Sequence, residues 1–330
     1  MIITRTPFRV SFAGGGSDIS SFYHRHEGCV VSTSINKYMY VVIHPSFNRL
    51  TTTIKYSKTE TVSQVKDIQH PIARQILLDY DVNGVEITST ADVPSGTGLS
   101  TSSAYTVGLI QAMNAYTGKY ESQEKIAAKA CEVEIEKLGE PIGKQDQYGT
   151  AVGGLKFICF RKDETVEVEQ IIMSSDMYQA LDDNLLLFYT GLTHSAGEIL
   201  KEQNKNVVSA DEKYRNVIQM TELAYELRDA LCHNNIDSFG QILHKGWMLK
   251  KGLSGAISTG QIDRSYERAM NAGALGGKLL GAGGGGFLLF YCSKEKQRRL
   301  RSELSDLIEL PFHMESEGTK VIYVGEKTWN

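Results

Sequence analysis

The sequence predicts a two-lobed protein of mixed α-helix and β-strand, on three observations. The chain has 330 residues, which corresponds to two domains or to one large two-lobed unit. Segments with the alternating pattern of strands and segments with the periodicity of helices follow one another along the chain. After about residue 190 the helical segments dominate, which places a domain boundary near that point.

Individual elements follow from this patterning and from cap and turn residues. Hydroxyl side chains can cap the helix that begins at Ser100, and Gly139 with Pro141 ends the helix that follows it. The predicted strands are Thr4–Ala13, Cys29–Ser34, Tyr38–Ile43, Val85–Thr90, Leu155–Phe160, Thr165–Val168, Asn184–Thr190, Phe287–Tyr291 and Val321–Val324. The predicted helices are Ser100–Ala115, Gln123–Leu138, Ala196–Asn206, Asp211–His233, Ile236–Lys251 and Ser293–Asp306.

Composition excludes several classes of protein. Lys and Arg total 35 against 39 Asp and Glu, a net charge of −4 that argues against a nucleic-acid or anionic-membrane partner. Arg5 and Arg9 interrupt any early signal-peptide core, and no apolar run approaches the ~18 residues of a membrane helix. The five cysteines form no CxxC pair, so neither zinc nor a disulfide framework is expected. We therefore expect a cytoplasmic, soluble globular protein. We take it to be a monomer or homodimer.

Glycine is frequent and clustered. There are 31 Gly against 6 Pro, and the clusters are Gly14–Gly16, the stretch Pro94–Ser103, and Gly281–Gly286. Because glycine has no side chain and reaches positive φ at little cost, such clusters mark sharp turns or close approach to a bound group.

Neither of two common phosphate-binding loops fits these clusters. A Walker A loop requires G-x-x-x-x-G-K-[ST], and the three Gly-Lys pairs are followed by Tyr, Gln and Leu. Gly281, Gly283 and Gly286 have the G-x-G-x-x-G spacing of a dinucleotide-binding fold, but they lead into a predicted strand rather than a helix. No H-R-D or D-F-G triplet occurs, which excludes a protein kinase.

The middle cluster has the context of an anion site. It lies between a predicted strand and the start of a predicted helix, where free N–H groups and the positive end of the helix dipole coincide. Phosphate is the usual anion at such a place. N-capping accounts for one of the four hydroxyl residues, Ser100, Thr101, Ser102 and Ser103, and one of the others could bind Mg²⁺.

Four motifs resemble those of the GHMP kinases, in the order of that family. The segment Pro94–Ala104 resembles the ATP-phosphate loop P-x-x-x-G-L-x-S-S-A, with Thr101 in place of a serine and one extra serine. Pro7–Asp18 resembles the N-terminal sugar-kinase signature, Pro141–Gln147 the P-x-G-x-x-D-Q segment of galactokinases, and Lys278–Phe287 the C-terminal glycine motif. The motif G-G-G-S-D and the later S-I-N-K-Y are most similar to heptose 7-phosphate kinases.

The resemblance implies an α+β fold in two lobes. It implies an ATP-binding domain of the ribosomal-S5-domain-2 type at residues 1–180 and a ferredoxin-like C-terminal domain at 181–330, with ATP and the acceptor in the cleft between them.

The resemblance also implies roles for individual residues. Asp146 matches the catalytic aspartate. Arg9 matches the family's basic residue, which would keep Asp146 ionised or lower the pKa of the acceptor hydroxyl. Ser102 and Glu134 match the Mg²⁺ ligands. The implied ATP-phosphate contacts are Pro94, Gly96, Thr97, Gly98, Leu99, Ser100, Thr101, Ser102 and Ser103, and the C-terminal glycine motif contributes Gly281, Gly283, Gly284 and Gly285.

The implied acceptor site begins at Asp18, which stands nine residues after Arg9, as the sugar-binding aspartate of galactokinases does. Gly15 and Gly16 replace the Glu and His of galactokinases, which disfavours a plain hexose. The implied substrate contacts are Asp18, Gly15, Gly16, Ser17, Lys144 and His194. By motif position, Lys144, Arg25 and Lys37 are the candidates for contact with a phosphate on the sugar.

These expectations describe a kinase that transfers the γ-phosphate of ATP to the anomeric hydroxyl of D-glycero-D-manno-heptose 7-phosphate. Two alternatives stay open: another anomeric sugar kinase of the fucokinase or galactokinase type, and a sugar- and ATP-binding sensor without turnover. The sequence selects no adenine-binding residue.

Overall fold

The computed structural model describes residues 1–192 and 196–325, which form two β-sheets and the helices packed on them. The first sheet has nine strands, six of them in the order β13-β1-β2-β5-β3-β4, while β6 and β12 also pair with β2, and β7 pairs with β6. Its strands are β1 Ile2–Ala13, β2 Gly28–Pro45, β3 Thr52–Lys55, β4 Thr59–Val62, β5 Val85–Ala91, β6 Leu155–Phe160, β7 Val166–Gln170, β12 Met314–Glu315 and β13 Lys320–Val324.

Strands β1 and β2 form the centre of this sheet. The sequence predicts two strands at residues 29–43, whereas the structure has one continuous strand, β2. The pairing with β1 shifts between Pro7 and Phe8, which face Tyr38 and Ile35, so Asn36 and Lys37 form a bulge. A bulge bends a strand without ending it, which explains why a break in the alternation does not break the strand.

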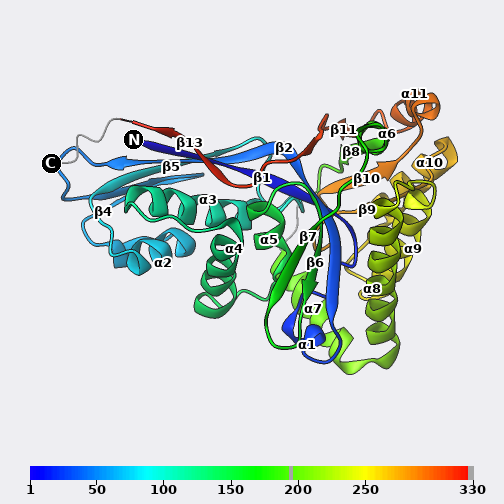
Figure 1. Cartoon of the computed structure of the whole chain (residues 1–330), viewed down its shortest axis with the longest axis horizontal. Helices are drawn as coiled ribbons and strands as arrows, with labels where there is room; N and C mark the ends of the chain where they lie inside the picture. Colours follow the sequence, from blue (N-terminus) through cyan, green and yellow to red (C-terminus); the bar gives the residue numbers. More distant parts are fainter. Residues whose placement is uncertain (193–195, 326–330) are drawn as a thin grey trace.

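Helices α2 to α5 gather on one face of the first sheet (Figure 1). Helix α3 is buried over nearly all of its length and packs on β1 and β2, as expected for a helix without a charged side chain. The helices of this half are α1 Ser20–Tyr23, α2 Pro71–Asp79, α3 Thr101–Tyr116, α4 Gln123–Cys131, α5 Gln145–Ala151 and α6 Ser175–Asp183, with a 3₁₀ turn at Val65–Asp67 and a π-helix at Glu132–Lys137.

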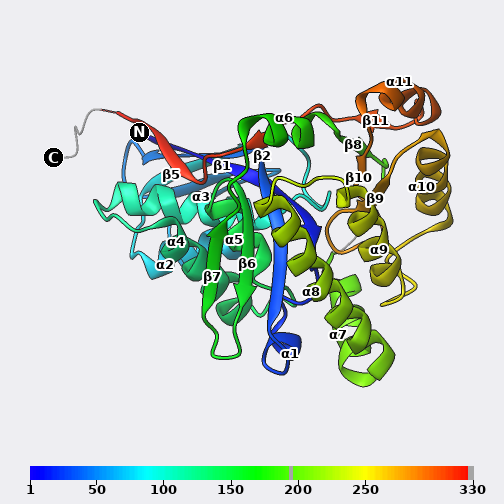
Figure 2. The ribbon, with the colours of Figure 1, turned by 45° about the vertical axis from the view of Figure 1, so that its right-hand side comes forward.

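The second sheet is antiparallel, in the order β11-β8-β10-β9, and belongs to the later half of the chain. Figure 2 shows helices α9 and α10 beside it and α7 below α8. Its strands are β8 Leu185–Tyr189, β9 Gly276–Leu279, β10 Phe287–Tyr291 and β11 Ile308–Glu309. The helices of this half are α7 Ala196–Ser209, α8 Asp211–Cys232, α9 Phe239–Lys251, α10 Gly260–Ala272 and α11 Lys294–Glu303.

The larger of two hydrophobic cores contains residues from both halves of the chain, and the second lies mainly in the later half. Helix α8 packs on β1 and β2, and the ring of Phe12 in β1 meets Phe239 of α9 edge-on at 5.0 Å. Strands β12 and β13 lie at the end of the chain but pair with β2 and β1. The two sheets are therefore not two separate segments of sequence, and the division at residue 180 stays a prediction. None of the described helices has both the length and the apolar character needed to cross a membrane.

Candidate active site

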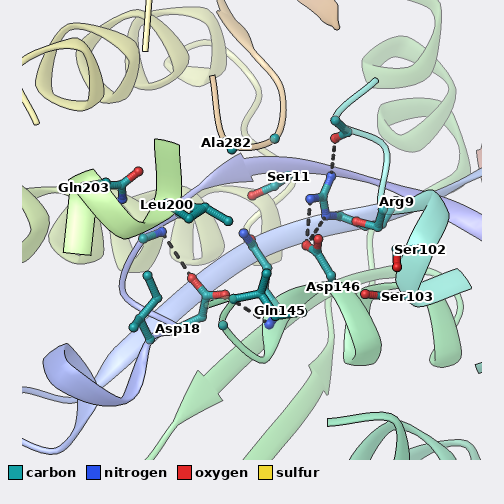
Figure 3. Close-up of a pocket in the computed structure, with 18 of the residues that line it drawn as sticks. Arg9, Ser11, Asp18, Ser102, Ser103, Gln145, Asp146, Leu200, Gln203 and Ala282 are labelled. Carbon is teal, nitrogen blue, oxygen red and sulfur yellow. Dashed lines mark hydrogen bonds and ion pairs between the residues drawn. The ribbon is translucent and has the colours of Figure 1, made fainter. Parts of the chain in front are cut away.

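A cavity of about 190 Å³ is lined by residues from both halves of the chain. The first half contributes β1, the turn that follows it, the loop before α3, and the start of α5. The second half contributes α7, α9, β9 and the glycine loop after β9. Figure 3 shows Asp18, Leu200 and Gln203 toward one end of this cavity, Ser102 and Ser103 at the other, and Arg9 with Asp146 between them.

An arginine–aspartate pair occupies the middle of the cavity. Arg9 of β1 donates from Nη2 and Nε to Oδ1 of Asp146, at 2.7 and 3.1 Å, and from Nη1 to the carbonyl of Gly98 at 2.9 Å. The short helix α5 approaches this closely because Gly149 has no side chain; a Cβ there would lie 3.0 Å from Cγ of Arg9. Arg9 is 2% exposed and Asp146 is 28% exposed.

The pair leaves one carboxylate oxygen available. Oδ2 of Asp146 accepts no hydrogen bond from the described residues, while Oδ1 accepts two from Arg9. A carboxylate fixed through one oxygen and open at the other, inside a cavity, can accept a proton from a bound hydroxyl group.

Glu134 is a buried carboxylate beside the cavity. Its Oε1 accepts hydrogen bonds from Thr106 at 2.9 Å and Ser102 at 3.3 Å, and its Oε2 from Ser103 at 2.8 Å and Gln147 at 2.6 Å. It lies in the π-helix, a distortion common at functional sites. Burial raises the pKa of Glu134, and the hydrogen bonds oppose that rise.

The loop before α3 is strained and tightly held. Ser100, at the N-cap, has φ 65° and ψ 38°, a left-handed conformation that is unusual for a residue other than glycine. Gly98 has φ +82°, and a Cβ on it would lie 2.5 Å from the carbonyl oxygen of Leu280. The loop is thus pressed against the C-terminal glycine loop, which holds the N-terminus of α3 at the cavity.

The turn after β1 has one strained glycine and one free glycine. Gly14 has φ +86°, and a Cβ there would overlap the carbonyl of Cys29. Gly15 has no such constraint, and a Cβ there would meet nothing within 4 Å. Gly16 has φ +91°, with its Cβ position 2.7 Å from Nε2 of Gln203. Only Gly15 could therefore accept a side chain, and that side chain would extend into the cavity that Gly15 lines.

Asp18 is buried below this turn. Backbone amides of Gly16 and Gln145 donate to its Oδ1 and Oδ2, each at 3.2 Å. Burial and the negative charge of Asp146 raise the pKa of Asp18, against these hydrogen bonds. A carboxyl group held by amides at the cavity edge can accept hydrogen bonds from the hydroxyls of a polyol.

Several buried polar atoms in the cavity have no partner among the described residues. They are the side-chain oxygens of Ser11, Ser100, Gln145 and Gln203. Buried polar groups are normally hydrogen-bonded, since an unpaired one costs about 1–3 kcal/mol. Their concentration in one cavity indicates a polar ligand with many hydrogen-bonding groups.

The structure places some of the predicted residues outside the cavity lining. Ser17 Oγ hydrogen-bonds the carbonyl of Gly14 at 2.7 Å and accepts from the amide of Cys29 at 3.0 Å. Lys144 forms an ion pair with Glu164. These contacts give Ser17 and Lys144 structural partners away from the lining.

Of the remaining predicted positions, some line the cavity and others are buried in the structure around it. Thr97 and Leu99 are fully buried, and Thr97 Oγ1 donates to the carbonyl of Pro94 at 2.9 Å. In the C-terminal motif Gly281 lines the cavity, whereas Gly283 and Gly285 lie against Ile257 and Leu192. His194 lies outside the described residues. The roles assigned to all of these residues stay predictions.

Lys250 and a second cavity escape the sequence analysis, and Lys278 enters it only as the first residue of the C-terminal glycine motif, without a role. Lys250 of α9 and Lys278 of β9 line the main cavity. Lys250 follows Leu243 and Trp247 on one buried helix face, and a lysine in an apolar stripe is the signal that could have identified it. The second cavity adjoins the phosphate loop and is lined by Tyr56, His70, Tyr105 and others.

The comparisons with known proteins assign the chain to a family. The GHMP kinases N terminal domain matches residues 65–154, and the GHMP kinases C terminal domain matches residues 227–309. The chain belongs to the GHMP kinases and is an ATP-dependent carbohydrate kinase, which confirms the family, the fold and the enzyme class expected from the sequence.

Two relatives and one solved structure show which sugar kinases the chain is similar to. The chain is 31% identical over 319 residues to D-glycero-alpha-D-manno-heptose 7-phosphate kinase of Campylobacter jejuni, with 91% of each chain covered. It is 26% identical to galactokinase of Pyrococcus furiosus, again with 91% of each covered. A D-glycero-D-manno-heptose 1-phosphate kinase from Bacteroides thetaiotaomicron has the same fold, at TM-score 0.81 and 22% identity over 99% of this chain and 100% of that one.

Proposed function

We propose that this kinase transfers the γ-phosphate of ATP to the anomeric hydroxyl of D-glycero-D-manno-heptose 7-phosphate. The product would be the 1,7-bisphosphate, a precursor for nucleotide-activated heptose. The observation that carries the proposal is the Arg9–Asp146 pair, with one open carboxylate oxygen, in a cavity beside a helix N-terminus.

The reaction needs a base at the acceptor hydroxyl. The anomeric oxygen forms a bond to the γ-phosphorus, the bond from that phosphorus to the β–γ bridging oxygen breaks, and Oδ2 of Asp146 takes the hydroxyl proton. Arg9 holds Asp146 through Oδ1 and favours its ionised form.

ATP has two adjoining places to bind. Backbone N–H groups at the start of α3 and the unpaired hydroxyl of Ser100 suit the phosphates. The second cavity shares Gly96, Thr101 and Ser102 with the first, so it continues from the phosphate site. Its aromatic residues Tyr56 and Tyr105 suit an adenine ring.

The residues beside the phosphate site fit a magnesium ion. Oγ of Ser102 lies 3.3 Å from Oε1 of Glu134, close to the separation of about 3 Å between adjacent ligands of an octahedral ion with bonds of about 2.1 Å. A hydroxyl and a carboxylate with the nucleotide phosphates form a donor set typical of Mg²⁺. Ser102 and Glu134 would hold the ion, which supplies charge neutralisation at the phosphates when bound.

The sugar site supports a larger and more highly charged acceptor than a hexose. Open space at Gly15 leaves room for a seventh carbon, and the relative that is 31% identical over 91% of this chain is named for a heptose 7-phosphate. Asp18 is positioned for vicinal hydroxyls of the ring, next to the backbone amides that hold it.

The proposal is tested by ADP release with a panel of acceptors: heptose 7-phosphate, free heptose, galactose, fucose and mannose. We expect turnover with the phosphorylated heptose to exceed that with every free sugar. Efficient use of galactose or fucose would instead establish an anomeric sugar kinase of the galactokinase or fucokinase type. Binding of ATP and sugar without ADP release from any acceptor would indicate a sensor.

A further inference from the structure

Two lysines from the second half of the chain are buried in the wall of the main cavity. Lys250, in the last turn of α9, is 7% exposed, and Lys278, in β9, is 5% exposed. Both lysines belong to elements after residue 238, and Lys278 is the first residue of the C-terminal glycine motif.

Neither lysine has an anionic partner within the part of the chain that the structure describes. Lys250 Nζ donates to the carbonyl of Gly281, and Lys278 Nζ donates to the carbonyl of Phe12 at 3.1 Å. An ammonium group has three donors, so each lysine keeps hydrogen-bonding capacity that these contacts leave unused. By contrast, the neighbouring Lys251 forms an ion pair with Asp263 at 2.5 Å and does not line the cavity.

Burying two cations in the wall of one cavity without a carboxylate partner is unfavourable. Burial and the charge of Arg9 lower the pKa of Lys250 to about 8, while Asp18 and Asp146 act in the opposite direction. Burial, Lys250 and Arg9 lower the pKa of Lys278 well below its ordinary value. An anion bound between the two lysines would relieve this repulsion.

The position of the lysines favours the acceptor over ATP as the source of that anion. The charges that raise the pKa of Lys250 are those of Asp18 and Asp146, which belong to the proposed sugar site. Lys278 contacts Phe12, at the end of β1 that leads into the glycine turn. The phosphates of ATP already have α3, the serine hydroxyls and the Ser102–Glu134 pair.

The charge balance supports the same choice. Arg9 already neutralises Asp146, so a neutral sugar would require no further cation except at Asp18. Two additional lysines exceed the single charge of Asp18 and leave positive charge for an anionic group on the acceptor. We propose that Lys250 and Lys278 form an anion subsite for the phosphate carried by the acceptor sugar, an assignment that rests on the proposed phosphorylated acceptor.

The test compares three variants: Lys250→Met, Lys278→Met, and Lys251→Met as the matched control from the same helix. Losing one charge-assisted hydrogen bond to phosphate should raise KM for heptose 7-phosphate about 10- to 100-fold in the first two variants. The preference for heptose 7-phosphate over free heptose should fall by a similar factor, KM for ATP should change far less, and Lys251→Met should behave as the parent does.

A binding measurement separates this proposal from the choice of substrate. Calorimetry with mannose 6-phosphate and with mannose needs no turnover, so it reports on the subsite even when the acceptor panel rejects heptose 7-phosphate. We expect Lys250→Met and Lys278→Met to lose the preference for the phosphorylated sugar. Equal weakening for both sugars, a raised KM for ATP, or no change in the two variants would each overturn the subsite.

Stability and pH provide readouts that a structural role would not produce. Methionine fills the volume of lysine without a buried charge, so melting temperatures should stay level or rise. KM for the phosphorylated sugar should increase as the pH passes above about 8, where Lys250, under the influence of Arg9, Asp18, Asp146 and Lys278, loses its proton. A lower melting temperature with an unchanged pH profile would assign the lysines to folding instead.

Discussion

The substitution Gly15→Glu tests how the glycine turn selects the acceptor. Gly15 lines the cavity, has no positive φ, and has open space around its Cβ position. A side chain can therefore be added without backbone strain, and it would enter the space proposed for the far end of the sugar. This separates the effect of the side chain on the ligand from its effect on the fold.

The magnitude follows from electrostatics. A glutamate about 4 Å from a phosphate would repel it by about 4 kcal/mol per pair of unit charges at an effective dielectric of about 20. That energy corresponds to a loss of about 10³-fold in kcat/KM for heptose 7-phosphate. Gly15→Gln has nearly the same volume and no charge, so the ratio between the two variants isolates the electrostatic part.

The assay is ADP release with heptose 7-phosphate and with free heptose, together with the melting temperature of each variant. We expect Glu to reduce use of the phosphorylated sugar far more than Gln, and the two to be alike with the free sugar. Gly15→Ala should melt as the parent does, whereas Gly14→Ala should be strongly destabilised, because its Cβ overlaps the carbonyl of Cys29. Equal loss with Glu and Gln, or unfolding of Gly15→Ala, would refute the reasoning.

Three further predictions concern the base, the metal and the pH dependence of stability. Asp146→Asn keeps an acceptor for Arg9 but removes the base, so turnover should fall about 10²–10⁴-fold while ATP affinity stays unchanged. Asp163→Asn, at an exposed aspartate, is the control. Unaltered turnover in Asp146→Asn would exclude Asp146 as the base. Ser102→Ala and Glu134→Ala should each raise the Mg²⁺ concentration for half-maximal rate, and an unmoved Mg²⁺ curve in both would exclude these ligands. Burial lowers the pKa of Lys156 to about 7. Above that pH the unfolded chain therefore binds more protons than the folded chain, and the free energy of unfolding should rise from pH 7 toward pH 10. Lys156→Met should flatten this rise in thermal melts, and the same dependence of melting temperature on pH in variant and parent would contradict the assignment.

The sequence predicts those parts of the site that lie in contiguous motifs. Arg9 and Asp146 are 137 residues apart, yet each stands in a motif that resembles the family, and the structure joins them at 2.7 Å. Ser102 and Glu134 likewise come together, at 3.3 Å. Most long elements agree with the patterns, because a buried face repeats along a helix or strand and can be read locally.

Elements that are short or that depend on distant neighbours could not be predicted in this way. Helix α5, which carries Asp146, has only seven residues and contains a glycine, so it shows no helical period. The π-helix at Glu132–Lys137 continues α4 with a different hydrogen-bond pattern, which no side-chain spacing announces. Strands β3 and β9 have four residues each, and β9 begins with two glycines.

Lys250 shows why a local sequence pattern does not predict which lysine lines the cavity. Lys250 and Lys251 are adjacent in sequence, but successive residues on a helix point about 100° apart, so one lysine lies in the cavity and the other pairs with Asp263. Read alone, two consecutive lysines predict a solvated helix end and a favourable interaction with its dipole. The stripe that places Lys250 inward runs through Leu243 and Trp247, and a cation at the end of an apolar stripe is expensive to bury unless a ligand provides the opposite charge. The same cost applies to Lys278, which begins the C-terminal glycine motif and lies between Gly277 and Leu279 in a buried strand. Two such lysines in the wall of one cavity therefore support the proposed anionic acceptor.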